Sequence, residues 1–260
     1  MYLAGIDVGS RAVKIVLIRQ GDETIVAQAV TDQRPDQKKT IDRLFRKVLS
    51  DSALKRKDVV RTISTGYGRE LVTFADAAVT EITSQAAGIR RLLPAARTII
   101  DIGGQDTKVI FLDSRGGVRD FATNDRCAAG TGRFFELLAE RLNVGIDSLG
   151  RLAKKSRRNV TINNTCAVFA ESEIIGLLAE GTPKYDIAAG VQNSIAVRIA
   201  CLAGRDVEMP LCFTGGVACI STMSGFIANA LDCEVLIAPQ PQFSCALGAA
   251  ILAGRQCAKS

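Results

Sequence analysis

The apolar positions of the chain fall into short runs that glycine, proline and charged residues interrupt. Runs rich in β-branched residues predict strands, and these are Val59–Thr65, Leu211–Thr214 and Val235–Ala238. Longer segments predict helices, which are expected over Asp36–Leu54, Thr80–Leu93, Arg133–Leu142, 167–180 and Ser244–Gln256. Strands and helices that alternate in this way predict an α/β fold.

One pattern occurs twice. Ile6–Leu17 and Ile100–Phe111 align with a constant offset of 94 residues, with Ile, Asp, Gly and Lys in register. Each copy predicts a strand, a tight Asp-x-Gly turn and a second strand. Backbone N–H groups at such a turn can bind an anion, and the aspartate can hold Mg²⁺ through water. A single hairpin of this kind is common, but two copies in register indicate a pair that grips a polyphosphate from both sides.

The repeat suggests two lobes. We place the first at residues 1–94, completed by the C-terminal helix 244–260, and the second at residues 95–243. The second lobe would hold the second hairpin and a Gly215–Gly216 turn after a strand, which is expected to open a helix. Paired glycines at a strand-to-helix turn allow the backbone to approach a nucleotide closely.

Composition narrows the class of protein. Apolar residues make up 47% and charged residues 23%, as in ordinary globular proteins. No apolar stretch approaches the roughly 20 residues that span a bilayer, and Asp7 interrupts the first apolar run, so we expect a cytoplasmic protein without membrane contact. The chain has no histidine, which excludes Ser-His-Asp and Cys-His catalysis and zinc sites that use imidazole.

The net charge of +6 comes partly from three basic clusters, 38–39, 55–57 and 154–158. They lack interleaved aromatic residues and the chain has no tryptophan, so we do not expect nucleic-acid binding. The first two clusters are interpreted as solvated surface. The third is a candidate for docking an acidic partner.

Two of the eight cysteines, Cys127 and Cys166, each precede a predicted helix. The partial positive charge of a helix N-terminus favours a thiolate, and thiolates are the ligands of iron–sulfur clusters. A four-iron cluster needs four of them, so a symmetric dimer would complete the set. The alternative is that they are ordinary buried thiols, as we expect for Cys201, Cys212, Cys219, Cys233 and Cys245, whereas Cys257 lies in the tail.

These motifs are similar to those of a known family. The chain resembles the ATP-dependent activators of 2-hydroxyacyl-CoA dehydratases, which are grouped with the ATPase subunits of benzoyl-CoA reductase as BadF/BadG/BcrA/BcrD-type ATPases. The matching stretches run from one end of the chain to the other and are Gly5–Ser10, Thr65–Arg69, Ile100–Asp106, Cys127–Phe134, Thr165–Glu173, Thr214–Ala218 and Ala246–Ala250.

The resemblance implies the actin-like fold of the sugar kinase, actin and chaperone ATPase superfamily, with duplicated ribonuclease-H-like lobes and the nucleotide held between them. It also implies a homodimer that shares one [4Fe–4S] cluster through Cys127 and Cys166 of each subunit. ATP hydrolysis would change the angle between the helices that follow these cysteines. A low-potential electron, supplied under anaerobic conditions by a ferredoxin or flavodoxin, would then pass to an iron–sulfur dehydratase or reductase.

The resemblance further implies roles for individual residues. Asp7 and Asp101 would organise Mg²⁺, and Gln105 would orient the attacking water. The nucleotide would contact Ser10, Arg11, Ala12, Val13, Lys14, Gly103, Gly104, Gly215, Gly216 and Gln242. The chain departs from the family where Thr83–Ala86 replaces a Ser-Cys-His-Ala sequence and where Arg11 follows Ser10.

Two other functions fit the same fold. A small-molecule kinase without a cluster would need a carboxylate base, for which Asp106 is the candidate, but the chain shows no substrate-binding insertion. A non-enzymatic actin-like scaffold would assemble with nucleotide and contain no iron.

Overall fold

The computed structural model describes residues 1–124, 127–158, 160–163 and 166–257. Thr165, part of the motif around Cys166, and the side chain of Cys257 lie outside the described part. The chain divides into two compact units. Unit 1 comprises residues 1–96, 112–118 and 238–260, and unit 2 comprises residues 97–111 and 119–237.

Unit 1 is built on a five-stranded sheet with the order β3-β2-β1-β4-β5. β1 pairs antiparallel with β2 and parallel with β4, which is the pattern of a mixed sheet. Its strands are β1 (Tyr2–Val8), β2 (Ala12–Arg19), β3 (Ile25–Asp32), β4 (Val59–Thr65) and β5 (Ala77–Ala78). Its helices are α1 (Gln37–Asp51), α2 (Glu81–Leu92) and α8 (Ser244–Cys257), with 3₁₀ turns at Arg56–Asp58, Arg69–Leu71 and Pro241–Phe243.

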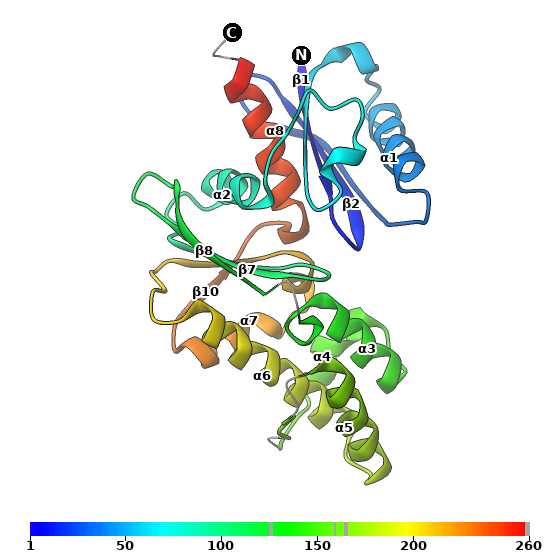
Figure 1. Ribbon diagram of the computed structural model, residues 1–260, viewed down its shortest axis with the longest axis vertical. Helices are drawn as coiled ribbons and strands as arrows, with labels where there is room; N and C mark the ends of the chain where they lie inside the picture. Colours follow the sequence, from blue (N-terminus) through cyan, green and yellow to red (C-terminus); the bar gives the residue numbers. More distant parts are fainter. Residues whose placement is uncertain (125–126, 159, 164–165, 258–260) are drawn as a thin grey trace. The chain divides into compact units, whose positions relative to one another are not determined.

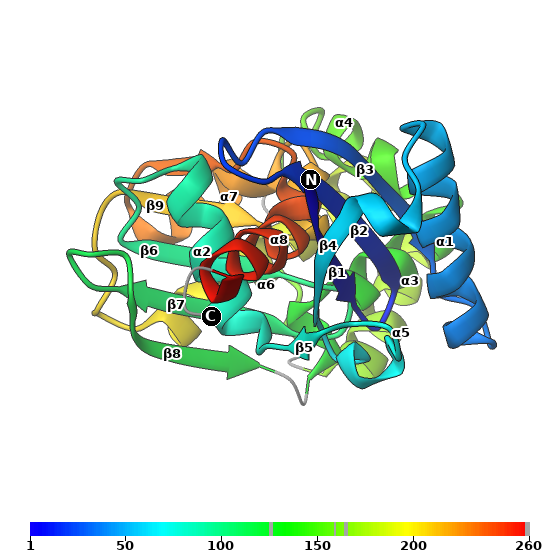
Figure 2. The same cartoon turned by 90° about the horizontal axis from the view of Figure 1, so that it is seen from above.

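Alternate residues of β1 and β2 face opposite sides of this sheet, as the strand period requires. Ile6 and Ile15 pack with Leu44 of α1 on one side. Leu3 and Val16 pack with α8 on the other. Figure 2 shows α1 and α8 on opposite sides of the sheet. Both faces are therefore covered, and the ends of β1 and β2 are left to carry polar side chains.

Helices α2 and α8 pack closely because small residues meet at their contact. A Cβ added at Gly248 of α8 would overlap the Ser84 carbonyl oxygen of α2, so only glycine fits there. Gln85 of α2, which is buried, donates a hydrogen bond of 2.8 Å to the Ser244 hydroxyl. This hydrogen bond joins α2 to α8, which packs against the sheet of unit 1.

Unit 2 contains a second five-stranded sheet, with the order β10-β9-β6-β7-β8. Its strands are β6 (Thr98–Ile102), β7 (Thr107–Leu112), β8 (Val118–Asn124), β9 (Leu211–Thr214) and β10 (Val235–Ile237). The helices are α3 (Gly132–Leu142), α4 (Leu149–Ala153), α5 (Ala167–Ala179), α6 (Lys184–Ala203) and α7 (Met223–Leu231), with 3₁₀ turns at Ala128–Gly130, Ile146–Ser148 and Gly216–Cys219. In Figure 1 these helices lie on one side of the sheet.

The two sheets have the same topology. In each, a central strand pairs antiparallel with the strand that follows it and parallel with a later strand: β1 with β2 and β4, and β6 with β7 and β9. The internal sequence repeat thus corresponds to a structural duplication, which confirms the predicted α/β class and duplicated lobes.

Two elements differ from the sequence expectations. Gly216–Cys219 forms a 3₁₀ turn rather than the start of a helix, because its N–H groups bond three residues back, and α7 begins at Met223. The 20-residue helix α6 was not expected. Its alanine-rich sequence is buried on much of its circumference, so it carries little amphipathic pattern.

Among the described residues, no helix combines the length and the apolar character that crossing a membrane requires.

Candidate functional site

The first candidate site surrounds the turn from β1 to β2 in unit 1. Asp7 and Lys14 are cross-strand partners, and Lys14 Nζ lies 3.0 Å from Asp7 Oδ2. The N–H of Gly9 donates to the carbonyl of Ala12 at 3.1 Å and closes the turn. Gln33, which the sequence analysis did not single out, donates its side-chain amide to the Gly9 carbonyl at 3.0 Å. The turn is therefore fixed at both ends, with a carboxylate and an ammonium group beside it.

The other predicted residues of this turn differ in exposure. Ser10 is half-buried and Arg11 is exposed. The Val13 side chain is fully buried in the core shared with α1, so only its backbone is available to a ligand. The N–H of Gly68 donates to the Val8 carbonyl at 2.9 Å, which brings the Thr65–Arg69 motif to the same end of the sheet.

The second candidate site surrounds the turn from β6 to β7 in unit 2. Asp101 and Lys108 are cross-strand partners, as Asp7 and Lys14 are in unit 1. The N–H of Gly103 donates to the Asp106 carbonyl at 2.9 Å. Lys108 forms an ion pair with the Asp106 carboxylate and is 7% exposed. Gln105, the residue predicted to orient water, is exposed at the tip of the turn.

The Gly215–Gly216 turn lies directly against this second site. Thr214, at the end of β9, is the strand partner of Asp101. Gly215 has a φ of +89°, and a Cβ there would overlap the Asp101 carboxylate. Only glycine combines that backbone conformation with that close approach. The fold of unit 2 therefore brings Asp101, Gly103 and Gly215 together, although more than 100 residues separate the first from the last.

The second turn is also bonded to the segment after Cys127. The carbonyls of Gly103 and Gly104 accept hydrogen bonds of 2.9 Å from the N–H groups of Gly132 and Arg133, the first residues of α3. The Thr107 hydroxyl, which is buried, donates to the Gly130 carbonyl at 2.6 Å. The first two bonds satisfy N–H groups that a helix start leaves without intrahelical partners, and all three join the turn to the segment that follows Cys127.

Both candidate cluster ligands belong to unit 2. Cys127 is half-buried, packs against the core and directly precedes the 3₁₀ turn that leads into α3. Cys166 is exposed and is the N-cap residue of α5. Helices α3 and α5 are joined by an ion pair between Arg141 and Glu171.

Within the described ranges, one chain holds no group of three or more histidine, cysteine, aspartate or glutamate side chains placed to bind a metal ion. Two thiols, Cys127 before a 3₁₀ turn and Cys166 at the start of α5, fit half of a four-thiolate site. A second copy of the chain would have to provide the other half.

The remaining cysteines only partly match the expectation that they are core residues. Cys212 and Cys245 are buried, but Cys201 and Cys219 are exposed, so the expectation is wrong for these two. The expectation rested on small apolar neighbours in the sequence. Such neighbours do not reveal which face of α6 carries Cys201 or which side of the 3₁₀ turn carries Cys219. Desolvation, and to a smaller extent the Asp147 carboxylate, raises the pKa of the Cys219 thiol, which disfavours the thiolate a cluster needs.

Gln242, predicted to border the nucleotide, is half-buried in the 3₁₀ turn Pro241–Phe243 that leads into α8. This turn belongs to unit 1, together with the first hairpin. No described contact joins Gln242 to the predicted phosphate-binding residues.

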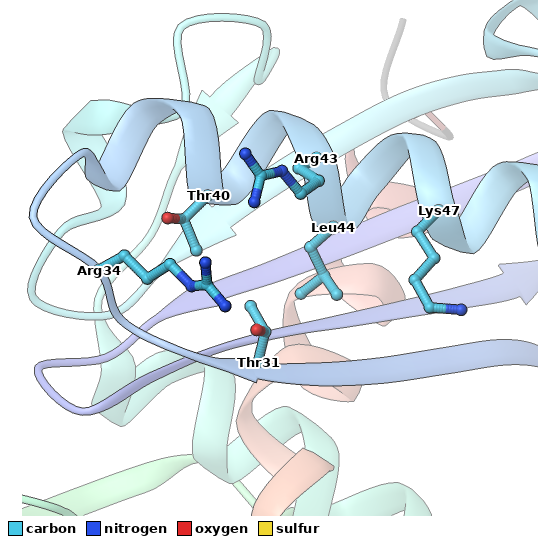
Figure 3. Close-up of a pocket in the computed structure, with 6 residues that line it drawn as sticks. All are labelled: Thr31, Arg34, Thr40, Arg43, Leu44 and Lys47. Atoms are coloured by element: carbon cyan, nitrogen blue, oxygen red, sulfur yellow. The ribbon is translucent and has the colours of Figure 1, made fainter.

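A separate pocket of about 100 Å³ lies between β3 and α1 (Figure 3). It is lined by Thr31, Arg34, Thr40, Arg43, Leu44 and Lys47. The Thr40 hydroxyl already donates to the Asp36 carbonyl at 2.9 Å, and Lys47 pairs with Asp51. None of the predicted site residues lines this pocket, so it is distinct from both hairpins.

The chain is similar to three proteins, one by sequence and two by sequence and structure. The activator of lactoyl-CoA dehydratase from Anaerotignum propionicum is 42% identical over 254 residues, which is 97% of each chain. The crystal structure of component A of (R)-2-hydroxyglutaryl-CoA dehydratase from Acidaminococcus fermentans is 40% identical, with a TM-score of 0.95 over 99% of each chain. The activator of 2-hydroxyisocaproyl-CoA dehydratase from Clostridium difficile, solved with bound ADPNP, is 38% identical, with a TM-score of 0.94 over 100% of this chain and 96% of that one.

The fold extends to more distant proteins. A glucokinase of the ROK family from Streptomyces griseus matches with a TM-score of 0.60 at 14% identity, over 98% of this chain and 100% of that one. This likeness shows the actin-like fold alone. The model of the BadF/BadG/BcrA/BcrD ATPase family matches residues 4–253, nearly the whole chain. The chain is therefore a member of the BadF/BadG/BcrA/BcrD ATPase family.

Proposed function

We propose that this protein is an ATP-hydrolysing activator that delivers a low-potential electron to a partner iron–sulfur enzyme. One observation carries the proposal: the second turn is hydrogen-bonded to the start of α3, which follows Cys127 after one 3₁₀ turn. Gly103 and Gly104, which would contact the nucleotide, accept bonds from Gly132 and Arg133. The proposed nucleotide turn would therefore be linked to the segment of Cys127 within one unit.

Both hairpins would contact the phosphates of ATP. Ser10 to Lys14 would line them in unit 1, where the Lys14 ammonium group beside Asp7 supplies a positive charge. Gly103 and Gly104 would do so in unit 2. Asp7 and Asp101 would hold Mg²⁺ through water, which is the usual arrangement for a carboxylate near a polyphosphate. The close approach of Gly215 to Asp101 supports a nucleotide position against the Gly215–Gly216 turn.

Gln105 and Gln242 have further roles in this proposal. The exposed Gln105 side chain would orient the water that attacks the terminal phosphate. Gln242 would border the bound nucleotide from unit 1.

Cys127 and Cys166 of two subunits would hold one [4Fe–4S] cluster, which supplies one-electron chemistry when bound. The exposed face of α5 supports a dimer at this position. Val168 and Phe169 lie two and three residues after Cys166, and they are 66% and 65% exposed. Ile175 continues the apolar surface at 49% exposure. A second copy that completes the thiolate set would cover this patch, which water would otherwise contact.

The electron acceptor would be a 2-hydroxyacyl-CoA dehydratase, because three similar proteins are activators or components of such enzymes. Their names refer to three different dehydratases, so similarity alone does not identify the substrate of the partner enzyme. An aryl-CoA reductase is the other class of electron acceptor. A ferredoxin or flavodoxin would supply the electron.

The basic segment 154–158 supports docking of such an acidic carrier. Lys154, Lys155, Arg157 and Arg158 are exposed. The buried Asp186 carboxylate holds the segment by accepting bonds from the Ser156 hydroxyl at 2.8 Å and the Arg157 N–H at 3.1 Å. The four cations are therefore presented from a fixed backbone.

The test is iron and acid-labile sulfide content, measured on protein purified without oxygen. About four of each per dimer are expected for one cube held by two subunits. Cys127→Ser or Cys166→Ser should abolish both contents and leave ATP binding intact. Cys201→Ser, which changes an exposed cysteine outside these motifs, is the matched control and should keep its iron.

Two outcomes would contradict the proposal. Iron retained in either ligand variant would rule out the assignment of Cys127 and Cys166. A wild-type protein that takes up no iron even after anaerobic reconstitution would leave an ATPase without a cluster. The small-molecule kinase would then be the function to pursue, although no structural observation favours it now.

A further inference from the structure

The two hairpins are equivalent at the level of individual hydrogen bonds. Gly9 bonds to Ala12 in the first, and Gly103 bonds to Asp106 in the second. Each strand pair then opposes an aspartate to a lysine: Asp7 to Lys14 and Asp101 to Lys108. All these positions are related by the same 94-residue offset. If Lys14 contacts phosphate, its structural counterpart Lys108 is placed to do the same.

Lys108 is nevertheless held differently from Lys14. Where the first turn has Ala12, the second has Asp106, and Lys108 forms an ion pair with that carboxylate. The Lys108 side chain is 9% exposed, whereas the Asp106 side chain is 32% exposed. A buried ammonium group needs a negative partner to offset its lost hydration. Asp106 provides one but keeps substantial contact with water.

The position of Lys108 connects it with the rest of the site in unit 2. Cross-strand partners project their side chains on the same side of a sheet, so Lys108 lies on the same side as Asp101. The Asp101 carboxylate lies against Gly215, on the turn proposed for the adenosine. A positive charge is therefore buried beside the groups that would hold Mg²⁺ and nucleotide.

We propose that Lys108 is a second phosphate-contacting lysine. Its ammonium group pairs with Asp106 until ATP binds and then pairs with the terminal phosphate. The inference rests on the proposed ATPase function and adds a catalytic residue to it. In the exchange the Asp106 carboxylate returns to water, and no covalent bond changes. The more highly charged phosphate is the stronger partner for a buried ammonium group.

During hydrolysis, Lys108 would stabilise the charge on the terminal phosphate oxygens. The oxygen of a water molecule bonds to the terminal phosphorus, and the bond from that phosphorus to the bridging oxygen breaks. ADP leaves with the electron pair, and the proton of the water passes to solvent. Positive charge fixed at the transferred phosphoryl group is a main source of rate enhancement in such reactions.

The experiment compares Lys108→Met with the matched control Lys39→Met, which removes an exposed lysine paired with Asp36. It measures the affinity for ADP, the affinity for a non-hydrolysable ATP analogue, the turnover number and the melting temperature. Lys108→Met should lower turnover about 100-fold and weaken the ATP analogue about tenfold, with ADP affinity close to that of the wild type. The control should match the wild type in all four.

Asp106→Asn provides the second variant. It removes the competing partner of Lys108, so the affinity for the ATP analogue should rise, opposite in sign to the effect of Lys108→Met. If the ion pair were purely structural, both variants would lower the melting temperature. Neither would change the affinity for the ATP analogue relative to the affinity for ADP. Should Lys108→Met fail to fold, Lys108→Arg and Asp106→Asn decide the question by the same measurements.

Several results would overturn the proposal. One is unchanged turnover in Lys108→Met, and another is an equal loss of ADP and ATP-analogue affinity. A third is a lower ATP-analogue affinity in Asp106→Asn. Failure of the proposed ATPase function itself is distinguishable, because the wild-type protein would then release no phosphate from ATP in the absence of an acceptor.

Discussion

At the scale of single residues, each of the two candidate sites contains an aspartate and a lysine that are cross-strand partners. Asp7 with Lys14 and Asp101 with Lys108 were traceable in the sequence because the repeat keeps them in register. The ion pair between Lys108 and Asp106 could not be traced in the sequence, because it depends on side-chain conformations that sequence spacing does not encode. Gln33 was missed for a similar reason: its amide contacts Gly9, which is distant in sequence.

Asp101→Ala should abolish Mg²⁺-dependent ATP hydrolysis, with turnover falling about 100-fold or more. The carboxylate is 9% exposed and lies against Gly215, so the variant loses a fixed negative charge where Mg²⁺ is proposed to bind. Phosphate release over a range of Mg²⁺ concentrations measures the effect. Asp22→Ala, at an exposed turn of unit 1, is the control. Turnover that stays at the wild-type level would defeat the assignment of Asp101.

At the scale of elements, the sequence patterns predict where helices and strands form but not which of them pack together. The helices expected at Asp36–Leu54 and Thr80–Leu93 are present as Gln37–Asp51 and Glu81–Leu92. Asp36 and Thr80 cap their first turns, which is why those starts were predictable. The contact between α2 and α8 was not predictable, because glycine in a helix gives no indication of its partner.

Gly248→Ala should destabilise unit 1 by about 1–3 kcal/mol. The new methyl group would overlap the Ser84 carbonyl and force α2 and α8 apart. Gly225→Ala is the matched control, since this exposed glycine of α7 has open space around it and alanine is the better helix former. Chemical denaturation measures both variants. A Gly248→Ala protein as stable as the control would show that the helices accommodate the methyl group.

Asp186→Asn should loosen the basic segment and lower stability at neutral pH. Burial raises the pKa of Asp186, but hydrogen bonds from Ser156, Arg157 and Arg158 outweigh it and leave the pKa below its ordinary value of 3.8. A depressed folded-state pKa stabilises the protein above that value, and the contribution is lost as pH falls through the folded pKa.

The difference in melting temperature between wild type and Asp186→Asn should therefore be largest near neutral pH and shrink below pH 3.8. Thermal unfolding followed from neutral to acidic pH measures it. A constant difference throughout that range would contradict an electrostatic role for Asp186.

At the scale of the whole molecule, the two main features are the duplicated sheet topology and the location of the basic residues. The two sheets share one topology, so one structural plan supplies both hairpins. Basic residues 154–158, Cys127 and Cys166 belong to unit 2. This arrangement places the proposed docking surface and the proposed cluster ligands on the same unit.

Replacing Lys154, Lys155 and Arg157 by glutamine should slow reduction by an acidic ferredoxin or flavodoxin about tenfold at low salt. The difference should shrink as salt rises, because exposed charges are screened. Stopped-flow absorbance at several ionic strengths measures it, and a small inorganic reductant, which needs no docking, is the control. ATPase activity and iron content should match the wild type. Equal slowing with both reductants would exclude a docking role.

The sequence by itself determined the α/β class, the duplication and the family, because repeats, turns and motif residues are local and keep fixed spacings. Tertiary structure decided what those motifs touch. It set the Asp101 carboxylate against Gly215, joined the second turn to the start of α3, and exposed Cys201 and Cys219. Such contacts depend on how distant strands and helices pack. Local residue patterns specify which element forms, and only packing specifies which elements meet.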